Sequence, residues 1–204
     1  MSAYNLTNLP PVILASESKY KRAVLEKLHI AFSCCAPNID ESALENESPD
    51  KLVTRLAKEK ALTIAKQHPH ALIIAADQVA SFNSHILGKP NNEENALKQL
   101  SLFSSNRVDF INGLALYDPR TQEVYQLCET FSVQFRSLSQ QELLLYIRKE
   151  KPFDCAGSFK SEGLGILLFD ALIGRDPNAL VGLPLIGLRE LFEQAQINLL
   201  ECIH

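Results

Sequence analysis

The sequence lacks several features that mark whole classes of protein. No apolar run approaches the roughly 20 residues of a membrane-spanning helix, so we expect no membrane segment. Residues 1–11 contain neither a basic cluster nor a long apolar stretch, which argues against a secretory signal and favours the cytoplasm. The five cysteines are odd in number and form no Cys-x-x-Cys motif, so we expect buried free thiols instead of disulfides or a structural zinc site. The five histidines show no metal-ligand spacing.

An excess of positive charge is also missing. The 204 residues carry a formal net charge of −4, the opposite of what a broad nucleic-acid-binding surface needs. Any phosphate site must therefore be a local cluster of cations. Hydrophobic residues make up 46% of the chain and charged residues 22%, an ordinary globular composition. We expect a single domain over residues 1–204, built as one large body or as two intimate lobes.

Hydrophobic patterning predicts an α/β fold, with a mixed sheet flanked by helices. The stretch at 71–76 is apolar throughout, so we expect a strand that is buried on both faces. Residues 79–82 and 86–87 flank a polar turn at Asn83 and Ser84. Ser18, Ser48 and Ser139 are the expected helix N-caps. We expect strands at 12–15, 31–36, 71–76, 108–116, 124–135 and 166–169, with the fourth and fifth forming an antiparallel hairpin, and helices at 19–28, 48–67, 91–104, 139–150 and 185–194.

Two segments next to predicted strands are candidates for phosphate chemistry. Ser16 and Ser18 lead into a helix whose first turn holds Lys21 and Arg22. Cations are unfavourable at a helix N-terminus, so their presence indicates a bound anion; the alternative is a capped helix with a solvated basic turn. Asp77 comes directly after the apolar stretch, where open α/β sheets place their ligands; the alternative is a carboxylate that caps a turn.

Three further segments are candidates with strong structural alternatives. Gly88-Lys89-Pro90 lacks the upstream glycines of a P-loop and reads equally well as a turn with an exposed lysine. The loop with Asp40 and Glu41 is either a solvated acidic loop or a pair of carboxylates that holds Mg²⁺ beside phosphates. The glycines of residues 156–165 fit neither Gly-x-Ser-x-Gly nor Gly-x-Gly-x-x-Gly. They nevertheless suggest that the backbone here lies close to a ligand, which Glu162 could contact.

Taken together, these segments resemble the Maf family of nucleotide pyrophosphatases over residues 13–193. The family implies an inosine-triphosphatase-like α/β fold of two lobes around a deep cleft, a divalent metal (Mg, Mn or Co), and cleavage of a nucleoside triphosphate to monophosphate and diphosphate. The ordered blocks that carry the resemblance are Leu14-Ala15-Ser16-Glu17-Ser18, Arg55-Leu56-Ala57-Lys58-Glu59-Lys60-Ala61, Ala76-Asp77-Gln78-Val79, Gly88-Lys89-Pro90, Ala156-Gly157 with Glu162-Gly163-Leu164-Gly165, and Val181-Gly182-Leu183-Pro184.

By this resemblance the general base falls on Asp77, with the metal held by Asp77 and Glu41. Whether Asp77 takes a proton or binds the metal stays open. One block departs from the family pattern Ser-x-Ser-Pro-Arg-Arg, because Lys19, Tyr20 and Lys21 replace the proline and both arginines. Lysine offers a point charge where arginine offers a bidentate fork, so Arg22 is an alternative partner for phosphate. The phosphate-binding residues fall on Ser16, Lys21, Lys60 and Lys89.

Three positions act as specificity readers in this family: Tyr20, Gln78 and Glu162. The combination resembles the branch that acts on 7-methyl-GTP, whereas the branch selective for pyrimidines has arginine, threonine and glutamine there. The chemistry agrees, because methylation at N7 makes the purine a cation that stacks on an aromatic face and is offset by a carboxylate. We therefore expect a 7-methyl-GTP pyrophosphatase that binds neither nucleic acid nor membrane. A dTTP or UTP pyrophosphatase, a nucleotide-binding regulator of cell division with little turnover, and assembly as a homodimer stay open.

Overall fold

A seven-stranded mixed sheet forms the centre of the computed structural model, counted over residues 9–83 and 85–202, which the structure describes. The strand order is β2-β1-β3-β5-β6-β7, with β4 paired to β3. β1 runs parallel to β2 and β3, and all other pairs are antiparallel. The strands are β1 Val12–Leu14, β2 Ser33–Cys34, β3 Leu72–Phe82, β4 His85–Leu87, β5 Arg107–Asp118, β6 Glu123–Phe135 and β7 Phe169–Ile173.

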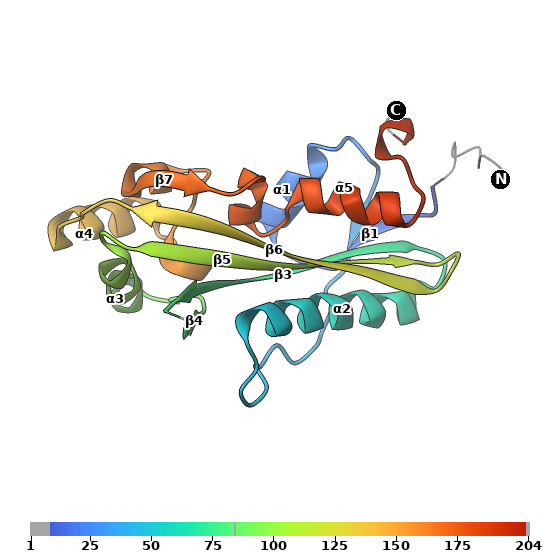
Figure 1. The fold of residues 1–204 in the computed structure, drawn as a ribbon, viewed down its shortest axis with the longest axis horizontal. Helices are drawn as coiled ribbons and strands as arrows, with labels where there is room; N and C mark the ends of the chain where they lie inside the picture. The colour runs from blue at the N-terminus through green and yellow to red at the C-terminus, as the bar shows by residue number, and fades with distance from the viewer. Residues whose placement is uncertain (1–8, 84, 203–204) are drawn as a thin grey trace.

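Helices cover both faces of this sheet, which confirms the predicted class (Figure 1). α2 (Pro49–Gln67) packs on one face, and α1 (Lys19–Glu26) and α5 (Leu185–Gln194) lie on the other. α3 (Glu93–Phe103) and α4 (Gln140–Glu150) gather at the far end of the long strands. None of the helices in the described part of the chain is both long and apolar enough to cross a membrane. The short 3₁₀ segments are η1 Ala156–Ser158, η2 Leu164–Leu168, η3 Pro177–Val181 and η4 Leu199–Glu201.

Helix starts follow local chemistry in two of three predicted cases. Ser18 accepts a hydrogen bond from Lys21 N, and Ser139 forms a reciprocal capping box with Glu142. Ser48 occupies the N-cap position of α2 without a side-chain bond to the helix. Pro49 and Asp50 supply the favourable first turn instead.

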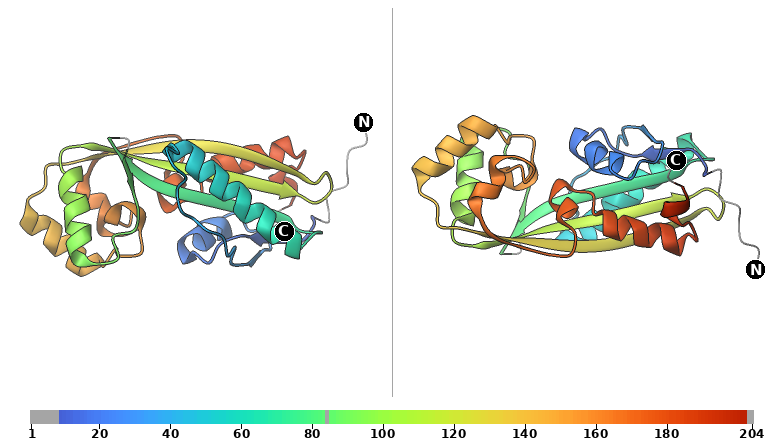
Figure 2. Two further views of the ribbon diagram at one scale, coloured as in Figure 1. Left: turned by 90° about the horizontal axis from the view of Figure 1, so that it is seen from below. Right: turned by 90° about the horizontal axis from the view of Figure 1, so that it is seen from above.

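The alternation of β3 divides the core into two layers. Ile73 and Ala75 point toward α2, whereas Ile74 and Ala76 pack with residues of α1 and α5. A third cluster, rich in phenylalanine, fills the space between α3, α4 and the far ends of β5 and β6. β3, β5 and β6 thus run through two lobes with separate cores. The views from below and above show the two lobes (Figure 2).

Besides shorter elements, such as β2 in place of the strand predicted at 31–36, three details differ from the sequence predictions. β3 does not stop at residue 76 but continues to Phe82, because β5 pairs with it from Ile73 to Ser81 and outweighs the polar interruption at Asp77. The strand predicted at 166–169 is instead η2 followed by β7, since the register with β6 begins only at Phe169. All five cysteines are free, but they are not uniformly buried, because Cys34 and Cys128 are exposed.

Candidate active site

A cleft of about 640 Å³ lies between the two lobes and collects residues from every segment that the sequence singled out. One wall comes from residues 15–21, after β1, and from residues 36–41. The other comes from residues 154–162 of the second lobe, and β3 contributes the floor. Nine of the ten predicted site residues line the cleft: Ser16, Tyr20, Lys21, Glu41, Lys60, Asp77, Gln78, Lys89 and Glu162.

The cleft exists because one side of β3 is left partly unpaired. β5 covers one edge of β3 along its length, so β1 and β4 must share the opposite edge. β1 reaches only to Ile74 and β4 begins only at Ala80, so residues 75–79 have no strand neighbour there among the described strands. Lys21 fills part of this gap, because its ammonium donates to the Ala76 carbonyl at 2.8 Å. Asp77 is therefore inside a strand, yet beyond the carboxyl end of the parallel neighbour β1.

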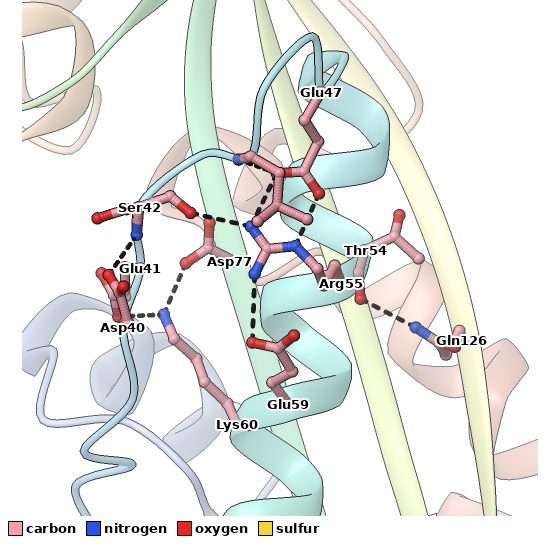
Figure 3. A network of polar contacts seen from close by, with 11 residues as sticks. Asp40, Glu41, Ser42, Glu47, Thr54, Arg55, Glu59, Lys60, Asp77 and Gln126 are labelled. Carbon is pink, nitrogen blue, oxygen red and sulfur yellow. Dashed lines mark hydrogen bonds and ion pairs between the residues drawn. The ribbon is translucent and has the colours of Figure 1, made fainter.

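Asp77 and Glu41 converge on the ammonium of Lys60 (Figure 3). Lys60 Nζ lies 2.6 Å from Asp77 Oδ1 and 2.6 Å from Glu41 Oε1. Lys60 and Asp77 are buried, only 6% and 7% exposed. Burial alone would lower the pKa of Lys60, but the two carboxylates outweigh it and raise that pKa. For Glu41, desolvation opposes ionisation, yet the bond to Lys60 holds its pKa below the ordinary value. Lys60 and Glu41 are thus both charged near neutral pH.

Arg55 fixes the acidic loop onto α2 (Figure 3). Its guanidinium binds Glu47 through two bonds of 2.7 Å and donates to the Ser42 carbonyl at 3.0 Å. A further bond of 3.2 Å reaches Glu59 one turn along the helix. Because Ser42 follows Glu41 directly, this bidentate clamp holds the Glu41 carboxylate over Lys60. Arg55 therefore positions the site without lining it.

Three lysines supply positive charge around the carboxylates. Lys21 is half-buried, and its burial lowers its pKa to about 8, with Asp77 opposing that shift and Lys60 adding to it. Lys89 is exposed on the cleft wall and has no ion-pair partner within the described residues. Ser16 Oγ accepts from Ser18 N at 3.1 Å, which orders the turn before α1. Gly182, at φ +92°, leaves room for Lys21, since a Cβ there would lie 3.0 Å from its Cε.

The three predicted specificity positions also line the cleft. Gln78 Nε2 donates to the Ala179 carbonyl at 2.6 Å, which fixes the orientation of its amide. The Tyr20 hydroxyl donates across the cleft to Asp154 at 3.1 Å. Burial, together with the nearby Cys155 and Asp154, raises the pKa of Tyr20. Glu162 is exposed and accepts from the Ser161 hydroxyl at 3.3 Å.

Sequence reasoning missed two residues and misplaced one. Asp154 lines the cleft, but nothing local distinguishes it from a solvated loop aspartate. Arg55 lies in a matched block, and its i,i+4 spacing to Glu59 was a usable signal. Arg22 is not among the residues that line the cleft: its guanidinium is exposed and pairs with Glu26 at 2.9 Å. The position after Lys21 is turned by about 100° around α1, and this turn directs Arg22 to Glu26 on the same helix instead of into the cleft.

The donor set is compatible with a divalent metal that arrives with its substrate. Within the described residues, no group of three or more histidine, cysteine, aspartate or glutamate side chains is arranged to hold a metal ion. Asp77 and Glu41 nevertheless bring two oxygen donors to one cation, the Lys60 ammonium, at 2.6 Å each. Mg²⁺ is typically bound by one or two carboxylates together with substrate phosphates and water. Asp77 and Glu41 are the residues that would hold it.

Comparison with known proteins agrees with this arrangement. The family model described as "Maf-like protein" matches residues 11–195. Proteins named 7-methyl-GTP pyrophosphatase from Pseudoalteromonas translucida and Alcanivorax borkumensis are 48% and 50% identical over 190 residues, covering 93% of this chain and 94% and 96% of theirs. A third with the same name, from Colwellia psychrerythraea, is 49% identical over 189 residues.

One solved structure supports the fold. The Staphylococcus aureus Ham1 protein aligns with a TM-score of 0.50 and 16% identity, covering 91% of this chain and 99% of its own. At that identity the likeness concerns the fold alone, which is of the inosine-triphosphatase-like type. With a family match over nearly the whole sequence and relatives near 50% identity, the chain belongs to the Maf family.

Proposed function

We propose that this protein is a hydrolase that cleaves 7-methyl-GTP to 7-methyl-GMP and diphosphate, and so removes a modified nucleotide from the cytoplasmic pool. The names of three near-full-length relatives support this assignment. The observation that carries it is that one cleft brings together two groups of side chains. Cations and paired carboxylates gather at Lys60, while an aromatic ring and carboxylates gather at Tyr20.

The side chains around Lys60 suit a triphosphate. Lys21, Lys60 and Lys89 surround the carboxylates closely enough for Asp77, Lys60, Glu41 and Lys89 all to act on Lys21 electrostatically. Preorganised cations of this kind stabilise charge that develops on transferring phosphoryl oxygens. Asp77 and Glu41 are two carboxylates, and they would repel a triphosphate that arrived without a metal ion.

The reaction breaks the anhydride bond between the α- and β-phosphates. A water molecule attacks the α-phosphorus, the bridging oxygen leaves with diphosphate, and the water proton passes to a base. Asp77 lies on the floor of the cleft beside Lys60 and would accept that proton or hold the metal. A bound divalent metal supplies Lewis-acid polarisation of the phosphate oxygens. Lys21, Lys60 and Lys89 then stabilise the charge on the leaving group.

The cleft side chains grouped with Tyr20 suit a methylated guanine. The N7-methyl purine is a delocalised cation, and a cation over an aromatic face is stabilised by roughly 0.5–2 kcal/mol. Glu162 can accept from the N1–H and N2–H₂ edge of guanine while offsetting that charge. Gln78 is held by backbone carbonyls through its nitrogen, so its oxygen is left to accept from the base.

The test is diphosphate release from 7-methyl-GTP, GTP, UTP and dTTP in the presence of Mg²⁺, Mn²⁺ or Co²⁺. We expect the highest kcat/KM for 7-methyl-GTP, and Glu162→Gln should lower its preference over GTP. Highest activity on UTP or dTTP would instead assign the pyrimidine-selective activity. Nucleotide binding without diphosphate release under any of these metals would favour a regulator.

A further inference from the structure

The face of the Tyr20 ring is occupied by a cation of the protein itself. Lys19 Nζ lies 4.9 Å from the ring centroid, a cation–π distance. The same ammonium lies 3.7 Å from Asp154 Oδ2. The Tyr20 hydroxyl donates to both oxygens of that carboxylate, at 3.3 and 3.1 Å. An aromatic face, a carboxylate and a cation are therefore assembled at one point of the cleft, from two different lobes.

Lys19 is held there only weakly. Its side chain is 74% exposed and that of Asp154 is 52% exposed. Ion pairs this exposed contribute little, because water screens them and long side chains lose freedom in forming them. An incoming cation can therefore displace Lys19 from the ring at little cost. A neutral molecule has no comparable reason to do so.

Two carboxylates, those of Asp154 and Glu162, lie near this point of the cleft wall. Asp154 and Glu162 both act electrostatically on Cys155, whose thiol pKa is raised to about 12, first by burial and then by these charges. Both carboxylates line the same wall as Cys155. The hydrogen bond from the Tyr20 hydroxyl to the Asp154 carboxylate also polarises the phenol O–H bond and raises the electron density of the ring. The ring face is thereby made more attractive to a cation.

We propose that Asp154 and Lys19 set the selectivity of this cleft for a positively charged nucleobase. The methylated purine replaces the Lys19 ammonium over the Tyr20 ring and lies beside the Asp154 carboxylate. Asp154 is a specificity-determining residue that rewards the positive charge of the base, and Lys19 is a competitor that the base displaces. This assignment rests on the proposed function, because it concerns how the same cleft distinguishes 7-methyl-GTP from GTP.

The experiment separates the charge of the base from its methyl group. 7-Deaza-7-methyl-GTP carries a methyl at the same position but is neutral, so its kcat/KM relative to that of 7-methyl-GTP measures charge recognition alone. We expect Asp154→Asn to lower the preference for 7-methyl-GTP over this analogue about fivefold. We expect Lys19→Gln to raise that preference about two- to threefold, through a higher kcat/KM for 7-methyl-GTP only.

Matched controls remove the same charges elsewhere. Asp170→Asn on β7 and Lys51→Gln on α2 alter exposed residues outside the cleft and should leave the preference unchanged. Equal effects of Asp154→Asn on both substrates would overturn the assignment of Asp154. A loss of activity on both substrates in Lys19→Gln would show a phosphate contact and overturn the displacement model. Because Lys19 is exposed, its variant keeps a test available even if Asp154→Asn fails to fold.

The outcomes also separate this inference from the proposed function. If the wild-type protein does not hydrolyse 7-methyl-GTP, the proposed function fails. If it does so without distinguishing 7-methyl-GTP from the neutral analogue, the proposed function survives and charge recognition by Asp154 and Lys19 is refuted.

Discussion

Replacing Asp77 by asparagine removes one negative charge from the floor of the cleft while keeping its shape. Asparagine retains an oxygen that can accept from Lys60 Nζ, and Glu41 stays 2.6 Å from the same nitrogen. The variant therefore removes the basicity of the carboxylate and its attraction for a metal, and little else. We expect kcat to fall by about 10²–10⁴, which corresponds to about 3–5 kcal/mol of transition-state stabilisation.

The stability cost should be much smaller than this loss. Removing one partner of a buried ion pair outright costs about 3–5 kcal/mol, because the remaining charge is left alone. Here Lys60 keeps an oxygen at position 77 and its ion pair with Glu41, so we expect about 1–2 kcal/mol. For a chain of 204 residues this corresponds to a fall in Tm of about 2–8 °C. The variant should thus be folded at assay temperature.

Measurements of ligand binding distinguish the two possible causes of a lower rate, which are loss of the catalytic carboxylate and collapse of the site. With Asp77 neutral, Lys21, Lys60 and Lys89 face one carboxylate fewer, so an α,β-methylene analogue of 7-methyl-GTP should bind without metal as tightly as to wild type, or more tightly. The assays are diphosphate release, calorimetric titration with the analogue and thermal unfolding, with Asp170→Asn as the control. A kcat within tenfold of wild type would refute the role of Asp77. A metal-free Kd that weakens in proportion to kcat/KM would show that the site had collapsed.

Three further predictions follow from neighbouring contacts. Arg55→Gln should lower kcat/KM about 10- to 30-fold and raise the half-saturating Mg²⁺ concentration, because the loop that carries Glu41 loses its bidentate clamp; an unchanged Mg²⁺ requirement would contradict this. The pKa of Lys21 is lowered to about 8, so the free enzyme loses this cation above that pH and kcat/KM should fall there, whereas Lys21→Arg should keep the profile flat to about pH 10. Stability has the opposite sign: the unfolded chain holds this proton up to its ordinary pKa of 10.5, so the contribution of Lys21 improves as pH rises from about 8 toward 10.5, as pH-dependent denaturant unfolding would show. Gly113→Ala should destabilise the protein by about 1–3 kcal/mol and lower activity, since the new Cβ would lie 2.1 Å from the Val53 carbonyl and push away α2, which carries Lys60; an unchanged Tm would refute the close approach.

Much of the fold follows from local patterns. α5 spans Leu185–Gln194 and α2 spans Pro49–Gln67, close to the predicted ranges, because apolar periodicity and proline or serine at the start act over a few residues. The β5–β6 hairpin and the parallel strand β1 also appear where they were expected. The predictions that were wrong depend on distant partners. The true extent of β3 and the position of β7 are set by hydrogen bonding to strands far along the chain.

The candidate site divides in the same way. The sequence alone supplied the residue types, with Lys21, Lys60 and Lys89 as cations and Asp77 and Glu41 as carboxylates. It could not show that, among the described strands, β3 has no neighbour on one side between Ile74 and Ala80, and this gap is what places Asp77 at the floor of a cleft. Nor could the sequence show whether Lys21 or Arg22 faces the cleft, since that depends on where α1 packs against the sheet.

Contacts between distant residues were decided by the tertiary structure alone. Tyr20 and Asp154 are 134 positions apart, and the packing of the two lobes around the cleft brings the phenol to the carboxylate. Arg55 reaches Glu47 only because the acidic loop folds back onto its own helix. Local sequence determines helix, strand and charge, because those depend on neighbours within a few residues. The proposed selectivity for a cationic base depends on which side chains meet across the cleft, and that is fixed by the pairing of strands and the packing of lobes.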